Sequence, residues 1–386
     1  MSALFEATAE ETDVSRGGPL SRARVACFIP DMTDGGAQRA VVKLIGGIAA
    51  RGLAVDLVLV NSEGPHLGAV DARARVVDLA AGRVARVIPK LARYLSRERP
   101  HALVSFLSHA NVAALASRAL ARSGARVAVV EQNTVSAVRS GLRRDGLLPA
   151  LVRRTYPRAD AVVAVSEGVA RDLVSRLGVP PGKVHVIPNP VVDEALLRAA
   201  TAPAGHPWFG DDGAPVFLAV GRLTAQKDFP TLLRAFRMLR QSRAARLMIL
   251  GEGEARAELE AMTDEMSLTD DVALPGFVEN PYARMSRAAA FVLSSRWEGL
   301  PTVLIEALAC GCPVVATDCP SGPREILEGG AYGALVPVGD AAAMRDAMAR
   351  ALDAPPRAAA LRGRAALYSV GRAVDQYLEL IGLARA

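Results

Sequence analysis

The feature that most limits the fold of this chain is an alternation of short apolar runs with amphipathic segments. Residues 24–29, 54–60 and 102–106 are apolar runs of strand length, and residues 37–52 have the apolar spacing of a helix. Continuous apolar strands joined by helices indicate a parallel sheet that is covered on both faces. The first part of the chain is therefore predicted to be an α/β domain.

The same alternation begins again after residues 201–215, a stretch rich in Pro, Gly and Asp that is typical of a linker. Apolar runs follow at 216–220, 246–250 and 313–317. A chain of 386 residues also exceeds the usual size of one hydrophobic core. We therefore predict two doubly wound, Rossmann-like domains that face each other across a cleft, with ligands bound at the carboxyl ends of the strands.

The predicted boundaries divide the chain into a disordered tail at 1–20, a first domain at 21–200 and a second domain at 201–365. Residues 366–386 have a helical apolar period and are expected to pack back on the first domain. The tail is acidic and lacks an apolar core, so it does not resemble a signal peptide. No apolar run approaches the roughly 20 residues that span a bilayer. The sequence therefore predicts a cytoplasmic protein.

Positive charge is concentrated in the first half of the chain. Residues 1–200 hold 27 Lys and Arg against 18 Asp and Glu, whereas the remainder holds 19 against 22. The excess lies mainly in residues 83–99 and 139–158 and indicates an anionic partner. Only 4% of residues are aromatic, which argues against single-stranded nucleic acid. The second run has the spacing of an interfacial helix, although a merely solvated arginine face is an equal alternative.

The cysteines do not indicate a metal site. Cys310, Cys312 and Cys319 lie near one predicted helix end, but no CxxC pair or nearby His supplies the usual ligand spacing. We interpret them, together with Cys27, as buried small apolar side chains. No metal ion is expected.

Two loops that follow apolar runs are candidates for binding an anion. Gly35 and Gly36 stand between a strand and a helix start, where glycine lets the backbone approach a ligand and free amides favour negative charge. A tight strand-to-helix turn is the alternative explanation. Arg222 and Lys227 follow the strand at 216–220, and two cations at one strand end can bind a diphosphate.

A carboxylate inside the most apolar helix is the least expected feature of the sequence. The segment TVLIEALA, residues 302–309, is apolar except for Glu306, and Glu298 precedes it by eight residues. Burial of an ionised carboxylate is costly unless it is hydrogen-bonded. Paired hydroxyls of a sugar would supply the hydrogen bonds that it needs. The alternative is a structural role, in which the Glu306 side chain caps a backbone group. The helix N-terminus after Gly299 would face the same cleft.

At these residues the chain resembles the retaining glycosyltransferases of family 4, which have the two-domain GT-B fold. The most specific part is the spacing of Glu298 and Glu306 within EGLPTVLIEALACGCPVVAT. The motifs GGAQR, SFLSHAN, SEGVARDL, VIPNP, QKDF and PGF support it in the same order along the chain. The resemblance covers almost the whole chain beyond the tail.

The resemblance implies a nucleotide-sugar donor, expected to be a UDP-sugar, held mainly by the second domain, and an acceptor held mainly by the first. Arg222 and Lys227 would bind the diphosphate. Glu298 would contact the transferred hexose or N-acetylhexosamine, and Glu306 the ribose hydroxyls. His109 would contact the sugar or the reacting centre. Further substrate contacts are implied for Gly35, Gly36, Phe277, Val278, Gly299, Leu300, Thr302 and Val303.

The resemblance also implies transfer with retention and no metal or other cofactor. The segment CPSGPREIL at 319–327 resembles members that build bacterial surface polysaccharides. An acceptor glycan on a polyprenyl diphosphate, at the anionic cytoplasmic face of the inner membrane, would fit the basic first domain. Gln38 and Gln132 depart from the Glu and His that are common in the family. The resemblance therefore says less about the acceptor site than about the donor site.

Two other functions fit part of the pattern. Nucleotide-sugar 2-epimerases share the two-domain architecture and cleave the same bond, but need acid and base carboxylates in the cleft. A non-catalytic sugar-nucleotide binding protein would have no need to keep Arg222, Lys227, Glu298 and Glu306 together. Turnover of a donor panel separates these possibilities from a transferase.

Overall fold

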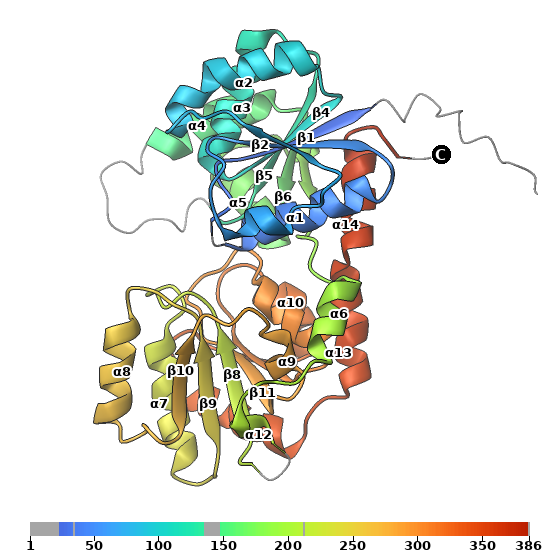
Figure 1. Cartoon of the computed structure of the whole chain (residues 1–386). Coiled ribbons are helices and arrows are strands. Elements are labelled where there is room, and N and C mark those ends of the chain that lie inside the picture. The colour runs from blue at the N-terminus through green and yellow to red at the C-terminus, as the bar shows by residue number, and fades with distance from the viewer. Residues whose placement is uncertain (1–22, 34, 135–146, 211–212, 385–386) are drawn as a thin grey trace, which may run out of the picture.

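The computed structural model describes residues 23–33, 35–134, 147–210 and 213–384. They form two α/β units, stacked one above the other in Figure 1. The predicted tail at 1–20 lies outside the described residues. The domain boundaries at residues 200 and 365 stay predictions.

The first unit is built on a seven-stranded parallel sheet with the order β3-β2-β1-β4-β5-β6-β7. Its strands are β1 (Arg24–Ile29), β2 (Ala54–Leu59), β3 (Arg75–Asp78), β4 (Ala102–Phe106), β5 (Arg126–Glu131), β6 (Ala161–Ala164) and β7 (Val184–Val186). Its helices are α1 (Gly36–Ala49), α2 (Val84–Glu98), α3 (Ser108–Ala121), α4 (Leu147–Thr155) and α5 (Glu167–Ser175).

The second unit has a six-stranded parallel sheet with the order β10-β9-β8-β11-β12-β13. Its strands are β8 (Val216–Val220), β9 (Arg246–Leu250), β10 (Val272–Gly276), β11 (Ala290–Leu293), β12 (Val314–Thr317) and β13 (Ala334–Val336). Its helices are α7 (Phe229–Arg240), α8 (Arg256–Glu265), α9 (Tyr282–Met285), α10 (Thr302–Ala309), α11 (Pro323–Ile326), α12 (Ala341–Asp353) and α13 (Ala358–Ala365).

The predicted fold class, two doubly wound parallel sheets, is confirmed. The predicted apolar runs form strands because their side chains are buried on both faces of each sheet. The edge strand β3 was not predicted, since its residues are mostly exposed and form no apolar run. In both sheets the strand order reverses beside the first strand, β1 or β8, and such switch points open a crevice at the carboxyl ends.

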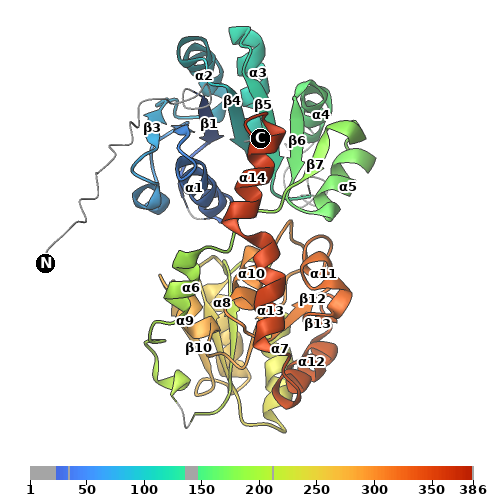
Figure 2. The ribbon, with the colours of Figure 1, turned by 90° about the vertical axis from the view of Figure 1, so that its right-hand side faces the viewer.

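The chain passes between the two units twice, and the two crossings lie side by side (Figure 2). The first leads from β7 into α6 (Glu194–Ala200), and the second leads from α13 into α14 (Val370–Leu380). The amides of Val191 and Val192 donate to the carbonyl of Tyr368, and the amide of Val370 donates to the carbonyl of Val192. These hydrogen bonds join the crossings into one short connection.

The C-terminal helix α14 packs on the first unit, as expected. Arg51 forms an ion pair of 2.6 Å with Asp375, and Gly47 lies so close to Val374 that an added Cβ would approach its Cγ2 to 2.5 Å. The helix α6, by contrast, is bound to the second unit. Asn280 and Ser286 donate side-chain hydrogen bonds to the carbonyls of Ala199 and Ala200.

Candidate active site

A cavity of about 490 Å³ lies between the two units, at the carboxyl ends of both sheets. Loops after β8, β9, β10 and β11 form its wall on the second unit, and α1 with the ends of β4, β5 and β7 forms its wall on the first. Most of the residues predicted for the site line this cavity: Gly35, Gly36, Arg222, Lys227, Phe277, Val278, Glu298, Gly299, Leu300, Thr302 and Val303. His109 and Glu306 do not line it.

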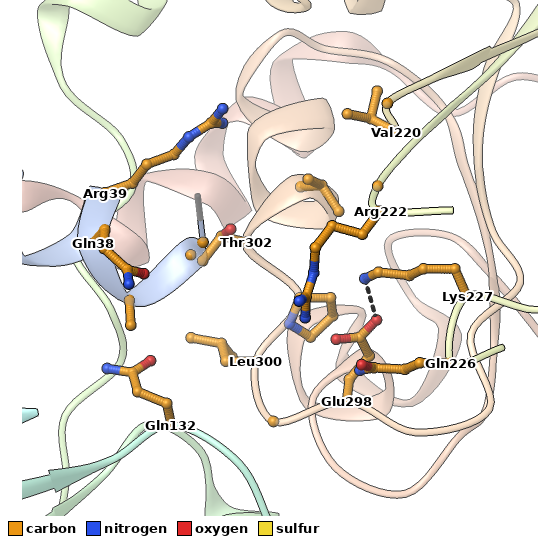
Figure 3. A pocket seen from close by; sticks show the side chains of 18 of the residues that line it. Gln38, Arg39, Gln132, Val220, Arg222, Gln226, Lys227, Glu298, Leu300 and Thr302 are labelled. Atoms are coloured by element: carbon orange, nitrogen blue, oxygen red, sulfur yellow. Dashed lines mark hydrogen bonds and ion pairs between the residues drawn. The ribbon is translucent and has the colours of Figure 1, made fainter. Parts of the chain in front are cut away.

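The two predicted cations lie on the loop between β8 and α7. Lys227 forms an ion pair with Glu298, with 2.6 Å between Nζ and Oε1, and Ser295 donates its hydroxyl to the same carboxylate oxygen. Arg222 is exposed and lies alongside this pair (Figure 3). Because the Lys227 and Glu298 side chains are only 15% and 8% exposed, the pair is a fixed part of the wall. The sequence suggested separate roles for these two residues but not their pairing.

The loop from Glu298 to Pro301 is held tightly between the units. A Cβ on Gly299 would come within 2.0 Å of the carbonyl oxygen of Gln132, so only glycine fits against the first unit there. Pro301 immediately precedes α10, whose first residue, Thr302, faces Gly36. An added Cβ on Gly36 would lie 3.7 Å from the Thr302 hydroxyl oxygen. The N-terminus of α10 therefore borders the cavity opposite the start of α1.

Glu306 lies one turn deeper in α10, behind the cavity. Its side chain is 3% exposed, and its Oε2 has no hydrogen-bond partner among the described residues. Burial raises its pKa above the ordinary value, while the nearby charges of Arg39 and Lys43 and a hydrogen bond with Tyr282 oppose that shift. An unpartnered carboxylate oxygen is a suitable acceptor for a ligand hydroxyl. The predicted burial of this carboxylate is confirmed.

His109 lies in the first turn of α3, is exposed, and does not line the cavity. Partial loss of hydration lowers its pKa, and the negative charge of Asp31 opposes this change. Its proposed contact with the sugar or the reacting centre stays a prediction.

Neutral amides that the sequence did not single out as ligands line the cavity on the first unit, together with Arg39 of α1. Gln132 and Asn189 are both buried and exchange two side-chain hydrogen bonds, of 3.1 and 2.7 Å. Asn133 lies next to them in the lining. A usable signal was present, because polar residues that directly follow an apolar strand lie at the ligand-binding edge of a parallel sheet.

Glu131, at the end of β5, supports this amide wall from below. Its two carboxylate oxygens accept from the hydroxyls of Ser108 at 2.8 Å and Tyr156 at 2.7 Å. Asn111 donates to the Tyr156 hydroxyl at 2.9 Å. Burial raises the pKa of Glu131 to about 7, although the hydrogen bonds from Tyr156, Ser108 and the backbone act in the opposite direction. The network joins the ends of β4 and β5 just beneath the cavity.

The four cysteines are all buried, which confirms their interpretation as small core side chains. Among the residues that the structure describes, no three His, Cys, Asp or Glu side chains gather closely enough to hold a metal ion. No helix in the same described ranges is long and apolar enough to cross a membrane.

Comparisons with known proteins agree with this geometry. Residues 34–195 match the family described as Glycosyltransferase Family 4, and residues 208–367 match the family described as Glycosyl transferases group 1. Together the two matches include both walls of the cavity.

Individual relatives match over different shares of the chain. The chain is 37% identical over 191 residues to the Campylobacter jejuni N-acetylgalactosamine-N,N'-diacetylbacillosaminyl-diphospho-undecaprenol 4-alpha-N-acetylgalactosaminyltransferase, covering 49% of each chain. It spans about half the length of this and other curated relatives. It is 27% identical to the Rhizobium meliloti lipopolysaccharide core biosynthesis glycosyltransferase LpsE, over 90% of this chain and 96% of that one.

Among solved structures, Anabaena HepE in complex with UDP and glucose superimposes with a TM-score of 0.78. The superposition covers 94% of this chain and all of that one, at 17% identity, and shows that the two share a fold. With matching family descriptions on both units and the GT-B arrangement of two facing Rossmann-like sheets, the chain belongs to the group 1, family 4 glycosyltransferases.

Proposed function

We propose that this protein transfers a hexose or N-acetylhexosamine from a nucleoside-diphosphate sugar to an acceptor hydroxyl, with retention of the anomeric configuration. The observation that carries the proposal is the convergence of Arg222, Lys227 and Glu298 at the carboxyl end of the second sheet. This cluster pairs cations for a diphosphate with a carboxylate for sugar hydroxyls, in a cavity that the first unit closes.

In the proposed reaction the bond between the anomeric carbon and the diphosphate oxygen breaks, and negative charge accumulates on the departing phosphate. Arg222 and Lys227 stabilise that charge as cations at the cavity wall, where Lys227 is held by Glu298 before the reaction begins. The acceptor hydroxyl attacks on the face from which the phosphate departs, and its proton passes to a phosphate oxygen. No side chain is assigned as a general base.

Glu306 is proposed to accept hydrogen bonds from the ribose hydroxyls of the nucleotide. Its buried Oε2 lacks a partner among the described residues, and two adjacent hydroxyls supply the donors that it needs. The backbone of Phe277 and Val278 would border the base, since both residues line the cavity. UDP is the proposed nucleotide, because the fold of HepE, which was solved with UDP, matches this one over 94% of this chain.

The test is a panel of UDP-, GDP- and ADP-sugars incubated with the full chain. We expect slow release of UDP from one sugar, which identifies a transferase that uses water as a poor acceptor. Interconversion of the sugar without release would instead identify an epimerase. Binding without any turnover would identify a sugar-nucleotide binding protein.

We further propose a lipid-linked glycan acceptor at the cytoplasmic face of the inner membrane. The name of the Campylobacter relative describes an undecaprenyl-diphosphate-linked acceptor. On this chain Arg153 and Arg154 are exposed on α4, and Leu147, in the first turn of the same helix, is 68% exposed. An exposed apolar residue near arginines suits an anionic membrane surface.

Vesicle binding tests the membrane part of the proposal. Reversing the charges of Arg143, Arg144, Arg153 and Arg154 should abolish sedimentation with phosphatidylglycerol vesicles, although the first two lie outside the described residues. Reversing Arg237 and Arg350, which are exposed on the second unit, should leave it unchanged. Equal binding of the wild type and the first variant would exclude this surface as the membrane contact.

A further inference from the structure

Two serine hydroxyls from different units converge on one carbonyl of the donor loop. The Gly299 oxygen accepts from Ser166 Oγ at 3.0 Å and from Ser321 Oγ at 2.9 Å, and the two hydroxyls lie 2.8 Å apart. Ser166 belongs to the first unit, is fully buried, and also caps α5 by accepting from the amide of Val169. The carbonyl that orients the Glu298–Pro301 loop is therefore held from both sides of the cavity.

Two residues without side chains are required at this point, Gly168 for the approach of the two units and Gly322 for the packing of the Glu298–Pro301 loop within the second unit. A Cβ on Gly168 would lie 2.5 Å from Ser321 Oγ and 2.9 Å from its Cα. A Cβ on Gly322 would lie 2.4 Å from Cδ of Pro301. Real Cβ atoms do not approach other atoms so closely, so the contact is built into the motifs at 166–173 and 319–327.

Ser321 holds its hydroxyl there in an unfavourable backbone conformation. Its φ is 69°, in the left-handed region that residues other than Gly, Asn and Asp rarely adopt. A strained residue persists where the surrounding structure and its role require it, and such residues cluster at functional sites. Glycine would adopt the same backbone without strain, but it would lack the hydroxyl.

Glu325 adds a second contact to the same helix. Its Oε2 accepts from the amide of Glu167, the first residue of α5, at 2.9 Å across the interface. A carboxylate at a helix N-terminus is favourable because it meets an amide without an intrahelical partner. The start of α5 is thus bound to the second unit at the Gly299 carbonyl and at the Glu325 carboxylate.

We propose that Ser166, Ser321 and Glu325 are positioning residues for the transfer, which fix the Gly299 carbonyl and thereby the loop that receives the donor sugar. This inference rests on the proposed function. The diphosphate cations Arg222 and Lys227 lie on the second unit alone, whereas the sugar loop is shaped by both units. Nucleotide affinity is therefore independent of this contact, and sugar-dependent affinity and turnover depend on it.

The experiment compares UDP with the UDP-sugar that the panel identifies, by calorimetry and by initial rates, in Ser166→Ala, Ser321→Ala and Ser321→Gly. We expect UDP affinity within about twofold of wild type and a KM for the UDP-sugar raised about tenfold, the size expected for lost hydrogen bonds. Ser321→Gly should keep or raise the melting temperature because it removes the strained φ. If the Ser321 hydroxyl served stability alone, Ser321→Gly would lower the melting temperature instead.

Two controls separate the outcomes. Ser175→Ala removes an exposed hydroxyl of α5 that donates to the Arg171 carbonyl, and it should leave all values unchanged. Glu325→Gln keeps an acceptor oxygen for the Glu167 amide and should stay close to wild type, whereas Glu325→Ala should follow the serine variants. If the wild type turns over the UDP-sugar and the serine variants have the same KM for it as the wild type, the positioning role alone is overturned. A wild type that binds no nucleotide would overturn the proposed function and this inference together.

Discussion

The two walls of the cavity differ in the polar groups that they present. The wall on the second unit carries charge: Arg222 beside the Lys227–Glu298 ion pair, with Glu306 buried behind. The wall on the first unit facing it consists mainly of neutral groups, the Gln132–Asn189 amide pair and the backbone at Gly35 and Gly36, and Arg39 of α1 lines it as well. Charge suits a diphosphate, which is constant among donors, whereas amides suit neutral hydroxyls, which differ among acceptors.

The walls also differ in how they are supported. Lys227 and Glu298 fix each other directly at the surface of the cavity. The amide wall rests instead on Glu131, a buried carboxyl group held by Ser108 and Tyr156. A change in the charged wall should therefore affect chemistry first, and a change below the amide wall should affect stability first.

The largest expected effect is on the charged wall. Lys227→Ala should lower kcat by about 10²–10³-fold, because it removes a fixed cation from the developing phosphate charge. It should change the affinity for UDP much less than kcat. Steady-state rates and calorimetry with the identified UDP-sugar measure both. Lys90→Ala, which removes a lysine that donates to the Leu79 and Ala80 carbonyls on the first unit, is the control. A kcat near wild type would contradict the assigned role.

The support of the amide wall should depend on pH. The folded pKa of Glu131, about 7, lies above its ordinary 4.5, so the folded state binds this proton more tightly than the unfolded state. The resulting stability is fully present below pH 4.5 and is lost as the pH rises through about 7. Glu131→Gln stays neutral, so its free energy of unfolding relative to wild type should rise by up to about 3 kcal/mol across that interval.

Urea denaturation of both proteins from pH 4.5 to about 8 measures this difference. A difference that stays constant with pH would show that Glu131 is ionised in the folded protein throughout. Glu131→Ala is not a substitute, because it would leave the Tyr156 and Ser108 hydroxyls without their acceptor.

The Glu306→Gln variant tests whether the carboxylate buried behind the charged wall serves nucleotide binding. Glu306→Gln should weaken UDP binding about tenfold, because it removes a charged acceptor for ribose hydroxyls. The same variant should be more stable than wild type at high pH, since burial disfavours the ionised carboxyl group. Titration with 2′-deoxyuridine diphosphate provides the matched ligand. Because this ligand lacks one ribose hydroxyl, the loss of affinity caused by Glu306→Gln should be smaller for it than for UDP. Equal losses for both nucleotides would place the ribose elsewhere.

The smallest effect on the donor is expected from the amide wall. Gln132→Ala and Asn189→Ala should leave UDP affinity within about twofold of wild type and should couple by about 1 kcal/mol in unfolding free energy. A double-mutant cycle by urea denaturation measures the coupling, and calorimetry measures the affinity. A loss of UDP affinity as large as that in Glu306→Gln would remove the distinction between the two walls.

Much of the scaffold was predictable from the sequence, because strands that are buried on both faces leave continuous apolar runs. The exposed edge strand β3 left none and was missed. The lining residues Arg222, Lys227, Glu298 and Thr302 were predictable as well, since ligand-binding loops follow parallel strands at their carboxyl ends. The placement of Glu306 behind the lining agrees with its position one turn into an apolar helix.

The contacts between these residues were decided only by the tertiary structure. The Lys227–Glu298 pair joins residues 71 apart in sequence, the Gln132–Asn189 pair 57 apart, and the Ser166–Gly299 hydrogen bond 133 apart. Local periodicity reports which face of an element is buried, but not which strand ends meet.

The sequence by itself therefore determined two parallel α/β sheets and the residue types at their ligand-binding edges. The folded structure decided which of those residues touch: a lysine held by a glutamate on one wall, two amides held by each other on the opposite wall, and a donor-loop carbonyl shared between the units. The physical reason is that parallel sheets gather the carboxyl ends of strands that are distant in sequence, and only the packing of the two units sets the distances across the cavity.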